Sequence, residues 1–365
     1  MADTGFYVED FLRQAVSVGA SDIHLSDGER PAIRVSGQIM RINVPALTAE
    51  DIEFIIRSIA PSNLKDKVSK FFDIDFSYEI EGCSRFRVNL SHQLGKTAMA
   101  FRVIPYYIIT VEDLMVPEDL KEFAGFNNGL VLVTGPTGSG KSTTIAALID
   151  YINMNTAKHI ITIEDPVEYI FTNKKSIISQ RQILIDTPSF ADGIKYSLRQ
   201  DPDVIFIGEI RDKHTVEAAL NAAETGHFVV STIHTNDAVQ TVSRIINLFE
   251  QSDRDFIREQ IASNLRGTVA QKLVPSADGK TRYPAVELLQ VTSTVKDFIQ
   301  KDELDSIYEL VKNGSFNKMI TMNMSLFNLY QEGKISKETA LEYSDNKSEM
   351  EQMMRGVYHG TGTKR

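Results

Sequence analysis

Several features that would set the class of this protein are scarce or missing from its 365 residues. The single cysteine, Cys83, excludes an internal disulfide framework and a cysteine-based zinc site, and it suits a reducing compartment. No apolar run approaches the roughly 18 residues of a membrane span. The N-terminus has neither the basic region nor the apolar core of a signal peptide. We therefore expect a cytoplasmic protein that is not inserted in a membrane.

The chain also has fewer basic residues than acidic ones. The net charge of −10 argues against a protein whose main partner is the backbone of a nucleic acid, although a local basic groove is compatible with it. The length favours two domains, each large enough for its own core. The regular patterns loosen around residues 111–117, where we place a linker. We expect an N-terminal domain over residues 1–110 and a second domain over residues 118–365.

The most informative stretch is a glycine loop. Leu130–Val133 has the composition of a buried strand, and Gly135–Ser142 then fits G-x-x-x-x-G-K-[ST] at every fixed position before a predicted helix over 142–149. In that context backbone N–H groups converge on phosphate oxygens. Lys141 is expected to reach the β- and γ-phosphates of ATP, and Ser142 to hold Mg²⁺. The predicted nucleotide-binding residues of the loop are Gly135, Pro136, Thr137, Gly138, Ser139, Gly140, Lys141, Ser142 and Thr143.

Four apolar strand-like runs recur in the second domain, separated by helical stretches, which indicates a parallel sheet. They cover residues 130–133, 159–163, 204–207 and 228–233. Ligands of open parallel sheets bind beyond the carboxyl ends of the strands. Polar residues follow all four runs, including Glu164, Glu209 and His234. We expect these groups to converge beside the phosphate loop.

Hydrolysis of a γ-phosphate needs a metal to neutralise charge and a group to position or deprotonate water. We assign Glu209 to Mg²⁺ and its water shell, and Glu164 to the attacking water. Asp203 precedes its strand and is therefore at the wrong end for either role. The alternative for both glutamates is a helix-capping carboxylate.

Histidines and arginines supply further candidates. His234 could contact the γ-phosphate, with a structural hydrogen bond as its alternative. His227 precedes its strand, at the opposite end from the nucleotide, and His159 begins its strand and is expected to be structural. Arg199 and Arg211 flank the third run, and either could stabilise charge in the transition state across a subunit contact. The alternative for both arginines is a salt bridge with nearby acids. Those acids are Asp201, Asp203 and Asp212.

The first domain reads as α+β. Helices are predicted over 6–18 and 48–59, and strands over 21–25, 32–35, 73–80, 84–92 and 96–104. Alternation puts Arg85 and Arg87 on one face of their strand, and Arg102 opposite the apolar face of the next. Two interpretations stay open: these arginines face water, or they meet the phosphates of a nucleotide held by another subunit. From residue 238 onward the pattern is mostly helical, with one apolar stripe at Ile257, Ile261, Leu265 and Val269 and a short strand at 285–289.

The motifs together resemble those of secretion ATPases. Residues 135–143 resemble their Walker A motif, and residues 163–169 resemble their Asp box. Residues 198–212 are similar to their Walker B region, and 226–236 to their His box. The resemblance covers about residues 5–345 and includes 19–24, 84–87 and 101–105 in the first domain. It is strongest for the type IV pilus retraction ATPases of the PilT and PilU type.

That resemblance implies a PAS-like first domain, a RecA-like second domain and a ring of six subunits. ATP would lie on one subunit and be closed over by the first domain of its neighbour, which favours nucleotide contacts for Arg85, Arg87 and Arg102. Glu164 would be the catalytic base. The ring would work on a platform protein at the inner face of the cytoplasmic membrane, with a paralogous retraction ATPase as a further possible partner.

Two stretches depart from the PilT pattern. Residues 294–299 keep the apolar and basic character of an Ala-Ile-Arg-type segment without its identity, and residues 329–346 look more like PilU. Retraction alone and an accessory role therefore both stay open. The alternatives are a pilus-assembly or type II secretion ATPase, which usually carries a four-cysteine zinc site, and a nucleic-acid translocase on the same core. The single cysteine and the acidic balance disfavour them.

Overall fold

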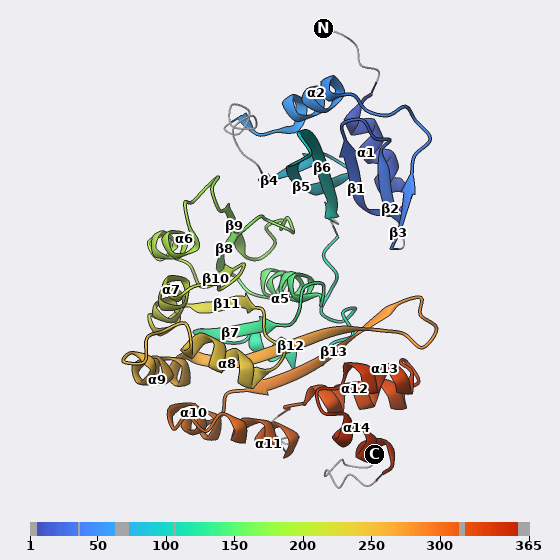
Figure 1. Cartoon of the computed structure of the whole chain (residues 1–365). Helices are drawn as coiled ribbons and strands as arrows, with labels where there is room; N and C mark the ends of the chain where they lie inside the picture. The colour runs from blue at the N-terminus through green and yellow to red at the C-terminus, as the bar shows by residue number, and fades with distance from the viewer. Residues whose placement is uncertain (1–5, 36, 63–72, 105–106, 314–317, 357–365) are drawn as a thin grey trace. The chain divides into compact units, whose positions relative to one another are not determined.

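The computed structural model describes residues 6–35, 37–62, 73–104, 107–313 and 318–356. The chain divides into two compact units, Met1–Tyr107 with Pro166–Ile170, and Ile108–Asp165 with Phe171–Arg365. Each unit has a sheet and a hydrophobic core of its own. Figure 1 labels the helices and strands of both units.

The first unit contains a six-stranded sheet in the order β3-β2-β1-β6-β5-β4, and each of its pairings is antiparallel. Its elements are α1 (Val8–Ser17), β1 (Ala20–Ser26), β2 (Ala32–Val35), β3 (Gln38–Arg41), α2 (Ala49–Ile59), β4 (Asp73–Ile80), β5 (Ser84–Gln93) and β6 (Lys96–Ile104). The sequence predicted all of these except β3. That edge strand is exposed along its length, so no alternation of buried and exposed residues marks it.

Local rules account for the elements that were predicted. In β5, Phe86, Val88 and Leu90 are fully buried, and the residues between them are only partly buried. This is the period of two expected of a strand with one face on the core. Helix α2 begins with a capping box, in which Thr48 and Asp51 each accept a hydrogen bond from the backbone N–H of the other.

The second unit contains a seven-stranded sheet in the order β13-β12-β7-β11-β10-β8-β9. Its strands are β7 (Gly129–Thr134), β8 (His159–Glu164), β9 (Ile177–Gln182), β10 (Val204–Ile207), β11 (Phe228–Ile233), β12 (Leu265–Pro275) and β13 (Arg282–Gln290). All neighbours pair in parallel except β12 and β13. The predicted α/β class and mostly parallel sheet are confirmed, and the four predicted strands form its centre.

The helical stripe predicted from Ile257 to Val269 is wrong in its second half. Helix α9 ends at Asn264, and Leu265 begins β12. Strand β12 pairs with β7 along one edge and with β13 along the other, and the consecutive residues 267–271 are all buried, so both faces of the strand are covered there. A strand buried on both faces has no period of two, and its apolar residues fell by chance at helical spacing.

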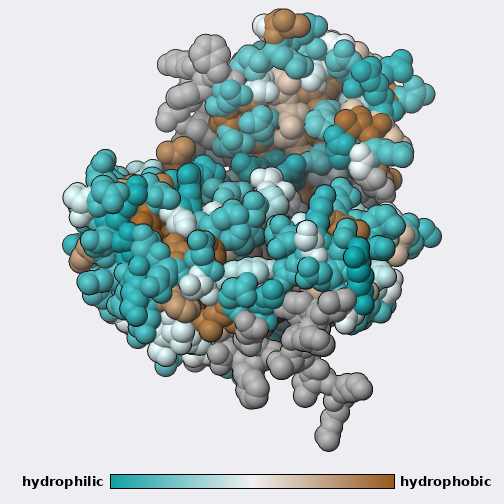
Figure 2. Space-filling view, turned by 60° about the horizontal axis from the view of Figure 1, so that its bottom comes forward, coloured by the Kyte–Doolittle hydropathy of each residue, from teal (hydrophilic) through white to brown (hydrophobic). Residues whose placement is uncertain are grey.

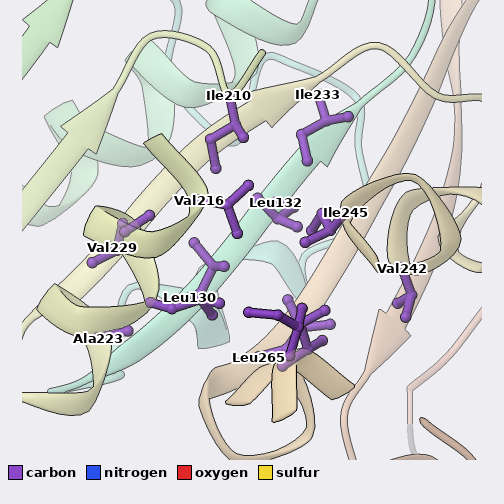
Figure 3. Close-up of a cluster of buried hydrophobic side chains, with 14 of the residues drawn as sticks. Leu130, Leu132, Ile210, Val216, Ala223, Val229, Ile233, Val242, Ile245 and Leu265 are labelled. Carbon is purple, nitrogen blue, oxygen red and sulfur yellow. The ribbon is translucent and has the colours of Figure 1, made fainter. Parts of the chain in front are cut away.

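Helices of the second unit pack on the sheet around one large core. They include α6 (Phe190–Ser197), α7 (Lys213–Glu224), α8 (Ala238–Ile246) and α9 (Arg254–Asn264). Helix α5 (Lys141–Asn155) contacts β7 and α4 (Leu120–Phe123). Figure 3 shows Leu130 and Leu132 of β7 together with Val216 of α7 and Ile245 of α8. These four side chains are at most 1% exposed. Because this core is closely packed, the carboxyl ends of the strands are held in place, and the loops that follow them start from fixed positions.

The C-terminal region is helical, as predicted. It contains α10 (Ser293–Gln300), α11 (Asp305–Asn313), α12 (Met322–Gln331), α13 (Lys337–Tyr343) and α14 (Lys347–Met354). A smaller core joins α12, through Met322 and Leu326, to Val274 of β12 and Ala285 of β13. Among the described residues, no helix has the length and apolar character needed to cross a membrane. The face in Figure 2 is largely hydrophilic, with hydrophobic side chains in small groups.

A buried carboxylate connects two of these helices to the sheet. Glu287 of β13 is 4% exposed. Its carboxylate accepts the N–H of Ala238, the first residue of α8, at 2.9 Å, and the N–H of Met322, the first residue of α12, at 3.4 Å. Burial, with a smaller effect from the negative charges of Asp237 and Asp345, raises the pKa of Glu287 from 4.5 to about 7, although the hydrogen bonds from Ala238 and Met322 act to lower it. The folded protein therefore keeps a proton on this group that the unfolded chain has released.

We expect the contribution of Glu287 to stability to fall as pH rises from about 4.5 to 7, because in this range the unfolded chain has released the proton while the folded protein still holds it. The proton-linked stabilisation is fully present below pH 4.5 and lost above pH 7, and at about 1.4 kcal/mol for each pH unit it amounts to at most about 3 kcal/mol. Glu287→Gln should gain stability relative to wild type over this window, measured by urea unfolding at several pH values. Glu217→Gln, at an exposed site on α7, is the control. Parallel pH profiles for wild type and Glu287→Gln would contradict the assignment.

Candidate functional site

The predicted phosphate loop lies between β7 and α5 (Figure 1). Gly135, Gly138 and Gly140 all have positive φ angles. Helix α5 has Gly140 as its N-cap and begins at Lys141. Because glycine has no side chain to cap the helix, no N-cap side chain competes with a ligand for the first N–H groups of α5.

Lys141 lies against the loop that it follows. Its side chain is buried, and Nζ donates hydrogen bonds to the carbonyl of Gly135 at 2.8 Å and of Pro136 at 3.0 Å. The ammonium group is therefore held over the loop by backbone carbonyls. A phosphate that entered the loop would offer Lys141 a charge-assisted hydrogen bond, which is stronger than one to a neutral carbonyl.

Glu164 is the last residue of β8 and is 5% exposed. Its Oε1 accepts the hydroxyl of Thr162 at 2.6 Å and the amide Nε2 of Gln180, from β9, at 3.3 Å. The side-chain oxygen Oε1 of Gln180 accepts the N–H of Phe171. The carboxylate is thus fixed by two strands. These contacts do not cap a helix, because both donors are side chains of strand residues.

Glu209 follows β10 and is held by a cation and an imidazole. Its Oε2 lies 2.7 Å from Nη2 of Arg211 and accepts a hydrogen bond from Nε of that residue at 2.8 Å. Its Oε1 lies 3.4 Å from Nε2 of His234, which follows β11. Gly208, the residue before Glu209, donates its N–H to Ile163, next to Glu164. Both acidic residues therefore leave the sheet from adjacent strands at the same edge.

His234 is neutral near pH 7. Partial burial lowers its pKa most, and the positive charges of Lys141 and Arg211 lower it further, against the opposing effect of Glu209. The charge of Lys141 therefore acts on the imidazole, which follows β11 at the same end of the sheet as the phosphate loop. His234, Glu209, Arg211 and Lys141 therefore form one electrostatic cluster.

The other two histidines make structural contacts at the opposite edge. His227 has its Nδ1 2.9 Å from the carbonyl of Ala222. His159 has its Nδ1 2.9 Å from the carbonyl of Gln200, and its Nε2 lies 3.1 Å from the hydroxyl of Ser179. Both lie at the start of their strands, away from the glycine loop.

The alternative role for Arg211 was a salt bridge with one of three nearby aspartates. In the structure its ion pair is with Glu209 instead. Asp203 instead accepts the N–H of His159 at 2.8 Å, and Asp212 caps α7 by accepting the N–H of Thr215 at 2.9 Å. Arg199 is exposed just beyond α6. Of the two arginines, only Arg211 lies in the cluster around Glu209.

The arginines of the first unit lie on one face of its sheet. Arg87 of β5 is directly opposite Arg102 of β6. Arg102 pairs with Asp22 at 3.0 Å, Arg87 with Asp75 at 3.9 Å and Arg85 with Glu79 at 3.8 Å. The side chain of Arg102 is 65% exposed and that of Arg85 is 15% exposed. Their contact with a nucleotide of another subunit stays a prediction.

Sequence reasoning missed the glutamines and the threonine that hold the predicted residues. Thr162 and Gln180 fix Glu164, and Gln271 of β12 contacts the phosphate loop. A polar residue inside an apolar strand run was the available signal for Gln271. This signal was overlooked because the segment before Gln271 was predicted to be helical.

Comparison with known proteins gives a consistent result over most of the chain. The model of the family described as "Type II/IV secretion system protein" matches residues 5–356. The type IV pilus retraction ATPase PilT of Pseudomonas aeruginosa is 38% identical over 335 residues, which are 92% of this chain and 97% of that protein. The type IV pilus ATPase PilU of the same organism is 37% identical over 347 residues, 95% of this chain and 91% of that protein.

A solved structure agrees with this. The crystal structure of the pilus retraction motor PilT with bound ADP superimposes with a TM-score of 0.89 at 43% identity, and it covers 95% of this chain and 100% of that one. At 95% of this chain, the match extends into both units.

Proposed function

Because the chain belongs to the type II/IV secretion system protein family, we propose that it is an ATP-hydrolysing motor that drives the retraction of type IV pili. One observation carries the proposal: a complete phosphate loop and two acidic residues from adjacent strands meet at one edge of the sheet. This arrangement is what γ-phosphate hydrolysis requires. Pilus retraction is proposed as the work that this hydrolysis drives because the chain is similar to pilus retraction ATPases over nearly its full length.

The roles follow from the positions of the groups. Lys141 and the N–H groups of the loop bind the phosphates. Glu164, fixed by Thr162 and Gln180, accepts the proton of the attacking water. His234, whose pKa is lowered by burial and by the charge of Lys141, orients Glu209 through its imidazole. Arg211 neutralises Glu209 and, with the exposed Arg199, is available for transition-state charge at a subunit contact.

The donor set of the site fits Mg²⁺. Ser142 and Glu209 offer hydroxyl and carboxylate oxygens, the ligands that this ion prefers, and Mg²⁺ commonly takes only one or two protein oxygens beside phosphates and water. Among the described residues no group of three acidic, His or Cys side chains could enclose a metal ion. Bound Mg²⁺ would neutralise charge on the phosphates.

The assembly is proposed to be a ring of six copies, in which Arg85, Arg87 and Arg102 of one copy approach the nucleotide of its neighbour. Domains over 1–110 and 118–365 joined by a linker would give each copy two bodies that can close and release. We place the ring at the inner face of the cytoplasmic membrane, on a platform protein of the pilus. A paralogous retraction ATPase is a further proposed partner.

Deleting the gene in its source organism is expected to abolish surface motility while pili are retained or in excess, because fibres would be assembled and not withdrawn. Motility is scored on agar, and surface pili are counted by shearing and electron microscopy. Complementation with the wild-type gene is the control. Cells without pili would contradict retraction and point to the assembly alternative.

A further inference from the structure

The phosphate loop contacts a strand that lies far from it in sequence. Strand β12 runs parallel to β7, with Ala270 in register with Thr134, the last residue of β7. Gln271 is therefore the first residue of β12 beyond that pairing, at the level where the chain leaves β7 and becomes the glycine loop. Its side chain is 2% exposed.

Both ends of the Gln271 amide contact the nucleotide-binding segment. Nε2 donates to the carbonyl of Ser139 at 2.8 Å, and Oε1 accepts the hydroxyl of Thr144, in the first turn of α5, at 2.7 Å. The backbone is equally close: a Cβ at Gly135 would lie 2.3 Å from the carbonyl oxygen of Gln271, and one at Gly140 would lie 2.8 Å from its Nε2. One residue of β12 thus contacts the start, the tip and the end of the loop.

The contact with Ser139 sets the direction of a backbone donor. In a trans peptide the carbonyl of one residue and the N–H of the next point in opposite directions. Because Gln271 holds the carbonyl of Ser139 toward β12, the N–H of Gly140 faces away from β12. Donors of that peptide and of the following helix turn are the groups that such loops offer to phosphate. The fixed amide therefore organises the loop before a ligand enters.

We propose that Gln271 is a positioning residue for nucleotide binding, which holds the Ser139–Gly140 peptide and the first turn of α5 in the phosphate-binding conformation. The inference rests on the proposed role of the loop in binding ATP, and it adds a residue outside the loop to that role. Gln271 touches no phosphate itself. It acts through the backbone of Ser139 and the hydroxyl of Thr144.

The test compares nucleotide affinity and catalysis in the full-length protein. Gln271→Met keeps the volume and removes both hydrogen bonds, and it should weaken the binding of a fluorescent ADP analogue about 10- to 100-fold. The KM for ATP should rise by a similar factor while kcat changes less, since the loop holds ground state and transition state alike. Gln271→Glu keeps the acceptor for Thr144 and turns an anion toward the carbonyl of Ser139, so it should bind more weakly still.

Two further variants make the result decisive. Gln290→Ala, on the neighbouring strand, removes a glutamine that donates to Glu122 instead, and it should bind like wild type. Thr144→Val preserves shape, removes one of the two contacts and should lose about 3- to 10-fold, with a less than additive effect in combination with Gln271→Met. Affinity is expressed per folded protein, measured by circular dichroism.

The outcomes separate this inference from the proposed function. Unchanged affinity in folded Gln271→Met would overturn the positioning role, and so would unchanged affinity in Thr144→Val if the methionine variant does not fold. A loss of stability in the absence of nucleotide, with affinity and KM at wild-type values, would mean a purely structural role and would also overturn it. Wild-type protein that binds no nucleotide would instead refute the ATPase assignment itself.

Discussion

Replacing Glu164 by glutamine is expected to lower ATP turnover by about 10²- to 10⁴-fold, the usual contribution of a positioned general base, and to leave ATP binding within a few-fold of wild type. Glutamine has the shape of glutamate and keeps an oxygen that can accept the hydrogen bonds of Thr162 and Gln180. The substitution therefore removes basicity and little else. The phosphate loop, which binds the nucleotide, is formed by other residues.

Steady-state phosphate release measures turnover, and equilibrium titration with a fluorescent ATP analogue measures binding. Glu217→Gln is the matched control, because its carboxylate is exposed on α7 beside His214 and should not affect either quantity. Wild-type turnover in Glu164→Gln would show that another group activates water, with Glu209 as the next candidate. Loss of binding together with turnover would show that the carboxylate supports the site and not the chemical step.

The centre of the second sheet was predictable because its strands are buried on both faces. Continuous apolar runs mark β7, β8, β10 and β11, and the residues that follow them share an edge in any parallel sheet. The positions of Glu164 and Glu209 follow from that rule alone. The glycine loop adds a motif whose fixed residues are set by backbone geometry.

The strands on either side of this centre were not predictable in the same way. Strand β9 lies at the edge of the sheet and is only partly buried, so its pattern is weak. Strand β12 has its apolar residues at spacings that also fit a helix. Partners set by tertiary pairing, such as the contact of Gln271 with Thr144 across 127 positions, leave no local pattern. Sequence reasoning therefore found the residues that we propose to act on phosphate and missed the residues that hold them in place.

Replacing Gly135 by alanine is expected to abolish nucleotide binding to within detection, a loss of at least about 100-fold, and to destabilise the protein by about 3 kcal/mol or more. Gly135 has φ 143°, which side chains rarely adopt, and a Cβ there would lie 2.3 Å from the carbonyl oxygen of Gln271 and 2.6 Å from Oγ of Ser139. Strained backbone and overpacking each cost about 1–3 kcal/mol. The clash with Gln271 is with backbone, so a change of rotamer cannot relieve it.

The control is Gly279→Ala, in the turn between β12 and β13. Gly279 also has a positive φ, of 68°, but nothing lies within 4 Å of its Cβ position. Gly279→Ala should lower the free energy of unfolding by only about 1 kcal/mol, through backbone strain, and should bind nucleotide like wild type. The two variants together separate conformational strain from steric exclusion. If both lose the same stability and both bind, then the loop can move away from β12 without harm, and the close approach of Gln271 to Gly135 is not what shapes the phosphate site.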